Sequence, residues 1–228
     1  MINRVQVEKF SVYLYFINPT CHNMKAITVI IFLLLFLSAD AQKFRINAGV
    51  SYCKLNWNTV PNTKLFDKAF ISYTAGVGIE YLKTGLFNLS SNIEYLRKGG
   101  IDDITYTDAM GNDLYTRNEA VIFNFIHVNT FARIKMPMPG KIKPFINLGV
   151  YGGYMVSANN LAGDESEYKR LTAGAVTGIG IGYKIIGKEI GVEAQYLPSF
   201  IPLYDKQTAG STRKITDKTF AVKLFFVM

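Results

Sequence analysis

The chain has 228 residues, of which 49% are hydrophobic, 14% aromatic and 18% charged, and its formal net charge is +8. This balance of hydrophobic and charged residues excludes a disordered chain. A mean hydropathy of +0.14, with a single strongly apolar stretch, excludes a polytopic helical membrane protein. The 16 Phe, 14 Tyr and 19 Gly, beside one Trp, favour strands over helices.

The first predicted element is an export signal. Residues 26–39 read AITVIIFLLLFLSA and carry no charge. This stretch is shorter than the ~20 residues that a membrane-spanning helix needs, but it has the length of the apolar core of a signal peptide. Met24-Lys25 supplies a start and a positive charge, and Ala39-Asp40-Ala41 supplies the small-residue cleavage pattern. We therefore predict cleavage before Gln42; a membrane anchor is the alternative.

The predicted signal peptide divides the chain into three parts. Residues 1–23 are an over-extended start or a disordered leader, residues 24–41 are the signal peptide, and residues 42–228 form one barrel domain. Cleavage removes Cys21 and leaves Cys53 alone, so we expect no intramolecular disulfide in the exported chain.

The exported part is organised by a period of two. In Lys43–Cys53, apolar side chains from Phe44 to Tyr52 alternate with polar or small residues from Arg45 to Ser51. Strict alternation over nine or more residues predicts a strand with one apolar face. The same pattern, with more noise in the later segments, predicts eight strands in all, at residues 43–53, 72–82, 87–95, 126–136, 145–154, 173–183, 189–196 and 219–228.

The predicted connections alternate between short and long. Short ones lie near residues 83–85, 137–141 and 186–187, and long polar ones near residues 54–69, 99–118, 157–170 and 198–218. With the N-terminus on the periplasmic side, every short connection falls on that side and every long one outside. Barrels of the bacterial outer membrane have this arrangement and an even number of strands. The pattern predicts an all-β fold, an eight-stranded antiparallel up-and-down transmembrane β-barrel preceded by a cleavable signal peptide.

Aromatic placement favours an outward apolar face. Several aromatic pairs are eight residues apart on that face, which spans about 20 Å along the axis of a tilted barrel and approaches the ~25 Å apolar band of a membrane barrel. We expect an aromatic girdle of Phe44, Tyr52, Tyr73, Tyr81, Phe87, Tyr95, Tyr183 and Phe220. The opposite face of the strands carries ionisable residues, which we expect to point into the lumen and to form an ionic network there. These residues are Glu80, Glu94, Arg133, Glu193 and Lys223. A soluble lipocalin-like barrel, with its apolar face inward, is the alternative.

Two segments resemble a known family. Residues 124–135, NFIHVNTFARIK, resemble the Tyr/Phe-x-x-Ile-Pro-x-x-x-Lys-Tyr strand of PorT-like outer-membrane β-barrel proteins, with Asn129 in place of the Pro. Residues 143–154, KPFINLGVYGGY, are similar to that family's Lys-Pro-Tyr-x-x-x-Gly strand. The Gly-rich residues 174–183 and 191–196 are similar to its penultimate hairpin. The chain ends on Met228, whereas that family ends on an aromatic residue. The resemblance implies an eight-stranded outer-membrane barrel, and some members are linked to protein secretion.

The sequence carries little that predicts catalysis. His127 is the only His after cleavage, and a lone strand His is more often packed than catalytic. We therefore expect no enzyme activity, no catalytic or metal-binding residues and no cofactor. One alternative is a lipid-modifying enzyme with His127 at an outward rim beside a Ser or carboxylate. The acidic residues Asp102, Asp103, Asp108 and Asp113 lack the spacing of a calcium loop and are expected to be solvated.

These observations predict a non-enzymatic, monomeric barrel of the outer membrane with a structural, secretion-related or ligand-binding role. Basic residues are scattered, as with Lys206, Arg213, Lys214 and Lys218 in the last long loop, which does not suit nucleic acid. The expected partners are outer-membrane lipid and, at the long loops, proteins or saccharides.

Overall fold

The computed structural model describes residues 43–60, 66, 68–84, 86–159, 168–208 and 211–228. The predicted signal peptide, its cleavage site and residues 1–23 lie outside the described residues. Within the described part, no helix has both the length and the apolar character needed to span a membrane.

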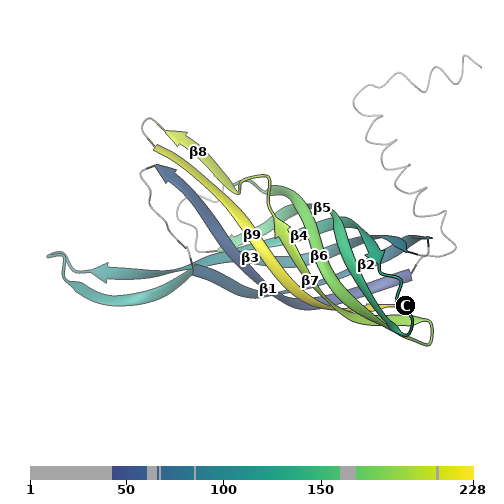
Figure 1. Cartoon of the computed structure of the whole chain (residues 1–228). Helices are drawn as coiled ribbons and strands as arrows, with labels where there is room; N and C mark the ends of the chain where they lie inside the picture. Colours follow the sequence, from purple (N-terminus) through teal and green to yellow (C-terminus); the bar gives the residue numbers. More distant parts are fainter. Residues whose placement is uncertain (1–42, 61–65, 67, 85, 160–167, 209–210) are drawn as a thin grey trace, which may run out of the picture. The chain divides into compact units, whose positions relative to one another are not determined.

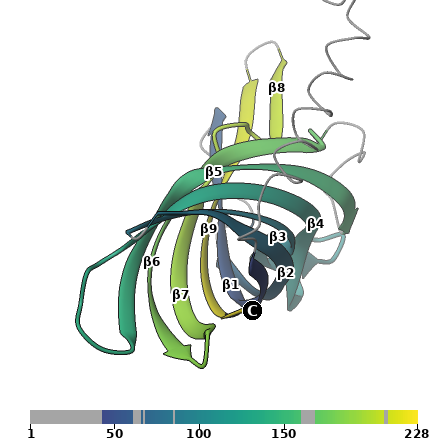
Figure 2. The same cartoon turned by 90° about the vertical axis from the view of Figure 1, so that its right-hand side faces the viewer.

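Nine antiparallel strands form one sheet that closes on itself (Figures 1 and 2). Each strand pairs with its sequence neighbour from β1 to β7, β7 pairs with β9, and β9 pairs with β1, which completes a ring of eight strands. The strands are β1 (Lys43–Val60), β2 (Lys68–Thr84), β3 (Phe87–Thr107), β4 (Asp113–Lys135), β5 (Ile142–Asn159), β6 (Leu171–Ile185), β7 (Lys188–Pro198), β8 (Tyr204–Thr208) and β9 (Ser211–Val227).

The predicted alternation of side chains is visible in the burial of each strand. In β1, Phe44, Ile46 and Tyr52 are exposed on the outer face, whereas Arg45 and Asn47 are buried inside the ring. We call the interior of the ring the lumen. Because the polar face points inward and the apolar face outward, the fold is the inverse of a soluble barrel, which excludes the lipocalin-like arrangement.

Short turns join the strands at one end of the ring, which we call the short-turn end. The β6–β7 turn has only two residues, Ile186 and Gly187, with φ angles of 44° and 77°. Left-handed conformations at both positions are typical of the tight hairpin turns whose twist matches that of paired strands. We call the opposite end, where the strands continue beyond the ring, the long-hairpin end (Figure 1).

All four predicted long loops are wrong in part, because they contain strand residues. The loop at residues 54–69 includes the end of β1 as far as Val60 and the start of β2, and the loop at residues 157–170 includes the end of β5. The other two loops contain hairpin strands. Residues 99–118 continue β3 and β4 as a hairpin, paired from Ile101↔Ala120 as far as Thr107↔Asp113. Within residues 198–218, β8 pairs with the first residues of β9, so the structure has nine strands where eight were predicted. Beyond the ring neither segment has a lumen face and a lipid face, so the alternation that revealed the other strands is absent.

Glycine permits close contact at the seam that closes the ring. Gly49 in β1 lies opposite Lys223 in β9. A Cβ atom at Gly49 would lie 2.0 Å from the Val222 carbonyl oxygen, far inside van der Waals contact. The absence of a side chain at this position therefore allows β1 and β9 to pair.

Candidate functional site

The largest group of buried ionic side chains lies in the lumen toward the short-turn end. Arg45 and Arg133 are fully buried there, and each contacts both Glu80 and Glu193. Arg133 donates to Glu80 at 2.8 Å and to Glu193 at 3.2 Å, and Arg45 donates to Glu193 at 2.6 Å. Two cations thus share two carboxylates, which compensates the cost of removing all four charges from water.

Aromatic rings fill the space around these two guanidinium groups. Phe145 and Phe225 pack edge to face at 5.5 Å between centroids. The Arg133 guanidinium carbon lies 4.1 Å and 4.6 Å from the two ring centroids, and that of Arg45 lies 4.4 Å from Phe225. Cation–π contacts of this kind hold the charged groups in place and fill the cross-section of the lumen.

Further ion pairs lie at other levels of the lumen. Lys223 donates to Glu94 at 2.7 Å and to the Gln195 side-chain oxygen at 2.8 Å. Lys98 donates to Asp217 at 2.8 Å, and both side chains have 0% exposure. The buried charges of the described residues balance, with five cations and five anions: Arg45, Lys98, Arg133, Lys135, Lys223, Glu80, Glu94, Glu189, Glu193 and Asp217.

An apolar cluster closes the lumen toward the long-hairpin end. Buried side chains of β1, β4 and β5 meet there with Phe66, Tyr168 and Leu203 from the connections between strands. The Phe123 and Tyr168 rings lie 5.6 Å apart, and the Tyr168 and Tyr204 rings 5.2 Å apart. Apolar packing at one end and ion pairs at successive levels therefore occupy the lumen, as expected for an eight-stranded ring, whose interior is just wide enough for its own side chains.

The five residues predicted for the lumen network are all buried, and the structure divides them between two levels. Glu80, Arg133 and Glu193 belong to one group, whereas Glu94 and Lys223 form a separate pair. The prediction omitted five further lumen charges: Arg45, Lys98, Lys135, Glu189 and Asp217. Strand parity could have found Arg45, Lys135 and Glu189, which alternate with apolar residues in predicted strands. Lys98 and Asp217 lie just beyond the predicted strand ends.

The residues predicted as an aromatic girdle lie on the outer face. Tyr81 and Tyr95 are partly buried and the others are exposed. Near the short-turn end lie Phe44, Tyr81, Phe87 and Tyr183, and farther along the strands lie Tyr52, Tyr73, Tyr95 and Phe220. Tyr52 lies opposite Phe220 in the β1–β9 ladder, and the Tyr73 and Tyr95 rings lie 5.9 Å apart. We call these four residues the upper aromatic row.

His127 lies inside the lumen and not at an outward rim. Its ring stacks on Tyr151 at 4.7 Å with an interplanar angle of 9°, and Phe125 packs against it edge to face. Among the described residues, neither ring nitrogen has a hydrogen-bond partner. The geometry that the enzyme alternative required, a Ser or carboxylate hydrogen-bonded to His127, is therefore not formed in the described part of the chain.

The β3–β4 hairpin beyond the ring carries the acidic residues of the second long connection. Asp108 accepts backbone N–H groups of Met110 and Asn112, each at 2.8 Å. The Asn112 side chain and these amides hold the pKa of Asp108 below its usual range. Tyr106 donates to Glu119 at 2.6 Å, which raises the pKa of its hydroxyl. Across the described residues, no three His, Cys, Asp or Glu side chains are grouped as a metal site requires.

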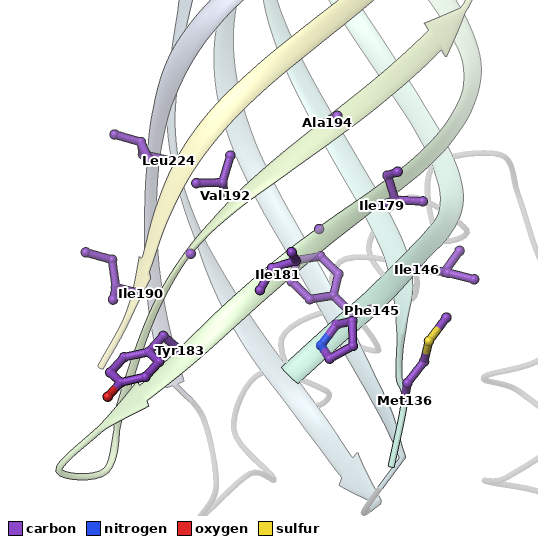
Figure 3. A pocket seen from close by; sticks show the side chains of 13 residues that line it. Met136, Phe145, Ile146, Ile179, Ile181, Tyr183, Ile190, Val192, Ala194 and Leu224 are labelled. Atoms are coloured by element: carbon purple, nitrogen blue, oxygen red, sulfur yellow. The ribbon is translucent and has the colours of Figure 1, made fainter. Parts of the chain in front are cut away.

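An apolar groove of about 840 Å³ lies on the outer face of β5, β6, β7 and β9 (Figure 3). Ile146, Ile179, Ile181, Val192 and Leu224 line it, and Tyr183 supplies its one ionisable group. Such a surface suits hydrocarbon and offers a polar ligand no charged partner.

Comparisons with solved structures show proteins that match most of the chain at low identity. OprG from Pseudomonas aeruginosa is 8% identical with a TM-score of 0.47, over 82% of this chain and 96% of that one. Neisserial surface protein A is 11% identical with a TM-score of 0.44, over 80% and 95%. Ail, the attachment invasion locus protein of Yersinia pestis, in complex with the heparin analogue sucrose octasulfate, is 12% identical with a TM-score of 0.42, over 82% and 99%.

No curated protein matches the chain. The model of one protein family, described as the outer membrane protein beta-barrel domain, matches residues 40–205, which is well over half of the chain. The match agrees with the closed antiparallel ring and with its apolar outer face. The chain therefore belongs to the outer membrane protein beta-barrel domain family, which confirms the prediction of a β-barrel that crosses the outer membrane with its strands.

Proposed function

We propose that this protein is a non-enzymatic, non-conducting outer-membrane barrel that acts as a scaffold for its two protruding hairpins. In this proposal the short-turn end faces the periplasm, and the long-hairpin end faces the exterior. The hairpins there bind protein or saccharide partners outside the cell.

The filling of the lumen is the observation that carries this proposal. Fully buried Arg45, Arg133, Lys98 and Lys223 are paired with carboxylates at successive levels, and an apolar cluster lies above them. An eight-stranded ring has just enough interior for its own side chains. A solute would have to break these ion pairs to pass, so transport through the barrel is a poor explanation for its existence.

The two hairpins offer surfaces of opposite charge. Residues 102–119 of the β3–β4 hairpin contain five acidic residues and one basic residue, Arg117. The β8–β9 hairpin carries Lys206, Arg213 and Lys214 against Asp205. Both extend beyond the ring at the long-hairpin end (Figure 1). This difference suits two kinds of partner surface, one basic and one anionic.

The proposed subgroup and the proposed export signal rest on the sequence. The resemblance of residues 124–135 and 143–154 to PorT-like strands supports assignment of the chain to that subgroup, with a secretion-related role as one reading. The apolar stretch at residues 26–39 supplies the export signal that an outer-membrane protein needs. We propose a monomer, because the ring closes within one chain and leaves no open edge at the level of the barrel.

Shortening each hairpin separately tests the proposal. In one variant a two-residue Asn-Gly turn replaces residues 104–117, and in the other it replaces residues 206–213. Both variants should fractionate with the outer membrane and keep heat-dependent gel mobility, because the ring is intact. Binding of cells expressing the protein to a panel of immobilised extracellular proteins and anionic polysaccharides should fall in one or both variants. Unchanged binding in both variants, or binding by neither the variants nor the full chain, contradicts the proposal.

A further inference from the structure

A repeated pair of residues marks the outer face just beyond the upper aromatic row. On each of three strands, a cation lies two residues beyond an aromatic residue, toward the long-hairpin end. The pairs are Tyr52 and Lys54 in β1, Tyr95 and Arg97 in β3, and Phe220 and Lys218 in β9. Residues two apart in a strand share a face, so each cation points outward like its aromatic neighbour.

Strand pairing brings two of these pairs, those of β1 and β9, side by side. Tyr52 lies opposite Phe220, and Lys54 lies opposite Lys218, in the β1–β9 ladder. Two ammonium groups therefore occupy neighbouring positions on the outer face. A step of two residues moves about 5 Å along the axis of a tilted barrel, so the cations lie just outside the level of the aromatic rings.

Arg97 is held in place by aromatic rings. Its guanidinium carbon lies 5.4 Å from the Tyr73 ring centroid and 5.9 Å from that of Phe70. Within the described part of the chain, its buried Nε atom has no hydrogen-bond partner, and no carboxylate forms an ion pair with its guanidinium group. A cation fixed on rings without an acidic partner is prepared to bind an anion from outside the protein.

Among the described residues, the acids near Arg97 and Lys218 are paired with other groups or face away. Asp103, on the same face of β3, forms an ion pair with Lys68. Asp217, adjacent to Lys218, points into the lumen and pairs with Lys98. The surface around Arg97 and Lys218 is therefore positively charged.

We propose that Arg97, Lys54 and Lys218 bind the phosphate groups of a phosphorylated lipid in the outer leaflet of the membrane. This inference rests on the proposed function, which places the upper aromatic row at the outer edge of the hydrocarbon. Aromatic rings at that edge put the three cations at the depth of the lipid head groups. Arg97 is the anchor, because its planar guanidinium can donate two parallel hydrogen bonds to one phosphate.

The test measures lipid retained by the folded protein. Full-length exported protein is refolded into phosphatidylcholine vesicles with and without diphosphoryl lipid A, extracted in mild detergent, and examined by native mass spectrometry. Wild-type protein should retain lipid A. The R97Q variant should retain on the order of tenfold less, because a charge-assisted phosphate contact is lost, and R97K should retain an intermediate amount. K218Q is a second variant at an exposed position and should also retain less.

Matched controls identify the cause of any change. R117Q removes an arginine from the β3–β4 hairpin, away from the aromatic row, and should retain lipid A like the wild type. Equal retention by R97Q, K218Q and the wild type overturns the lipid site while leaving the barrel intact. Displacement of lipid A by inorganic phosphate as readily as by added lipid A overturns the lipid assignment, because the site would then serve a soluble anion. Failure of the wild type to insert, seen as no heat-dependent gel shift, overturns the proposed function instead.

Discussion

The isolated ion pair between Lys98 and Asp217 allows a quantitative test of the lumen. Both side chains have 0% exposure, and their charged atoms lie 2.8 Å apart. Replacing either partner alone leaves the other charge buried without its counter-ion, with an expected loss of about 3–5 kcal/mol in the free energy of unfolding. We predict this loss for K98M and for D217L.

The double variant K98M/D217L should be much closer to the wild type. Replacing both partners of a buried ion pair by apolar residues often leaves the stability of the folded protein unchanged or increases it. Met also keeps apolar contact with Phe125 and Tyr151, whose ring centroids lie 5.1 Å from the Lys98 ammonium. The loss of these cation–π contacts costs about 0.5–2 kcal/mol. The two substitutions should therefore be coupled by about 3 kcal/mol or more.

Urea unfolding of the vesicle-inserted protein measures the free energy of unfolding of the wild type, the two single variants and the double variant. Unfolding is followed by the fluorescence of the single Trp and by gel mobility. The ion pair between Lys68 and Asp103 supplies the control, because its side chains are 59% and 41% exposed. A double-mutant cycle with K68M, D103L and the two combined should give a coupling free energy of about 0.2–1 kcal/mol. A coupling for Lys98 and Asp217 no larger than this control would refute the account of the lumen as a paired, water-excluding interior.

Three further predictions follow from other parts of the molecule. Gly49→Val should prevent folding, because a Cβ at this position would lie 2.0 Å from the Val222 carbonyl oxygen. Gly152→Val should fold, because nothing lies within 4 Å of a Cβ there, and heat-dependent gel mobility distinguishes the two variants. The depressed pKa of Asp108 means that its contribution to the hairpin turn is present above the usual pKa of Asp and is lost as pH falls through the lower folded value. The protection of the Met110 and Asn112 amides, measured as their exchange rate relative to the intrinsic rate at the same pH, should therefore fall only below about pH 4, and a fall near neutrality would contradict this. His127→Phe should keep the stacking on Tyr151 and remove two buried ring nitrogens without partners, so the free energy of unfolding should change by less than about 1 kcal/mol. Lipid A and phospholipid species should be unchanged in cells that express this variant, and altered lipids would revive the enzyme alternative.

Strand positions could be predicted because the ring imposes a period of two wherever one face meets the lumen and the other meets lipid. Glu80 and Glu193 were assigned to the lumen on parity alone, and both are buried. The β3–β4 hairpin beyond the ring and β8 could not be found in this way. Each is stabilised by pairing within a hairpin. Apart from the buried pair of Tyr204 and Ile215 at the base of the β8–β9 hairpin, these segments do not lie between the lumen and lipid, so they need not alternate polar and apolar residues.

The filling of the lumen could be predicted only in part. Phe145 and Phe225 are inward residues at positions where the pattern predicts polar ones. Their rings fit because the residue opposite each one in the adjacent strand is a glycine, Gly180 for Phe145 and Gly191 for Phe225. A Cβ at Gly180 would lie 2.3 Å from the Phe145 ring, and one at Gly191 would lie 2.6 Å from the Phe225 ring. This pairing of large and small residues joins positions far apart in sequence, so it depends on strand register and not on local pattern.

Conductance across a planar bilayer is the most direct test of a barrel closed by its own side chains. The folded wild-type protein should insert, as shown by heat-dependent mobility of the same preparation, and leave the bilayer current at its baseline. Sustained current steps of open-channel size, present with folded protein and absent after heat denaturation, would contradict the account. Such steps would mean that ions pass the buried network of Arg45, Arg133, Glu80 and Glu193.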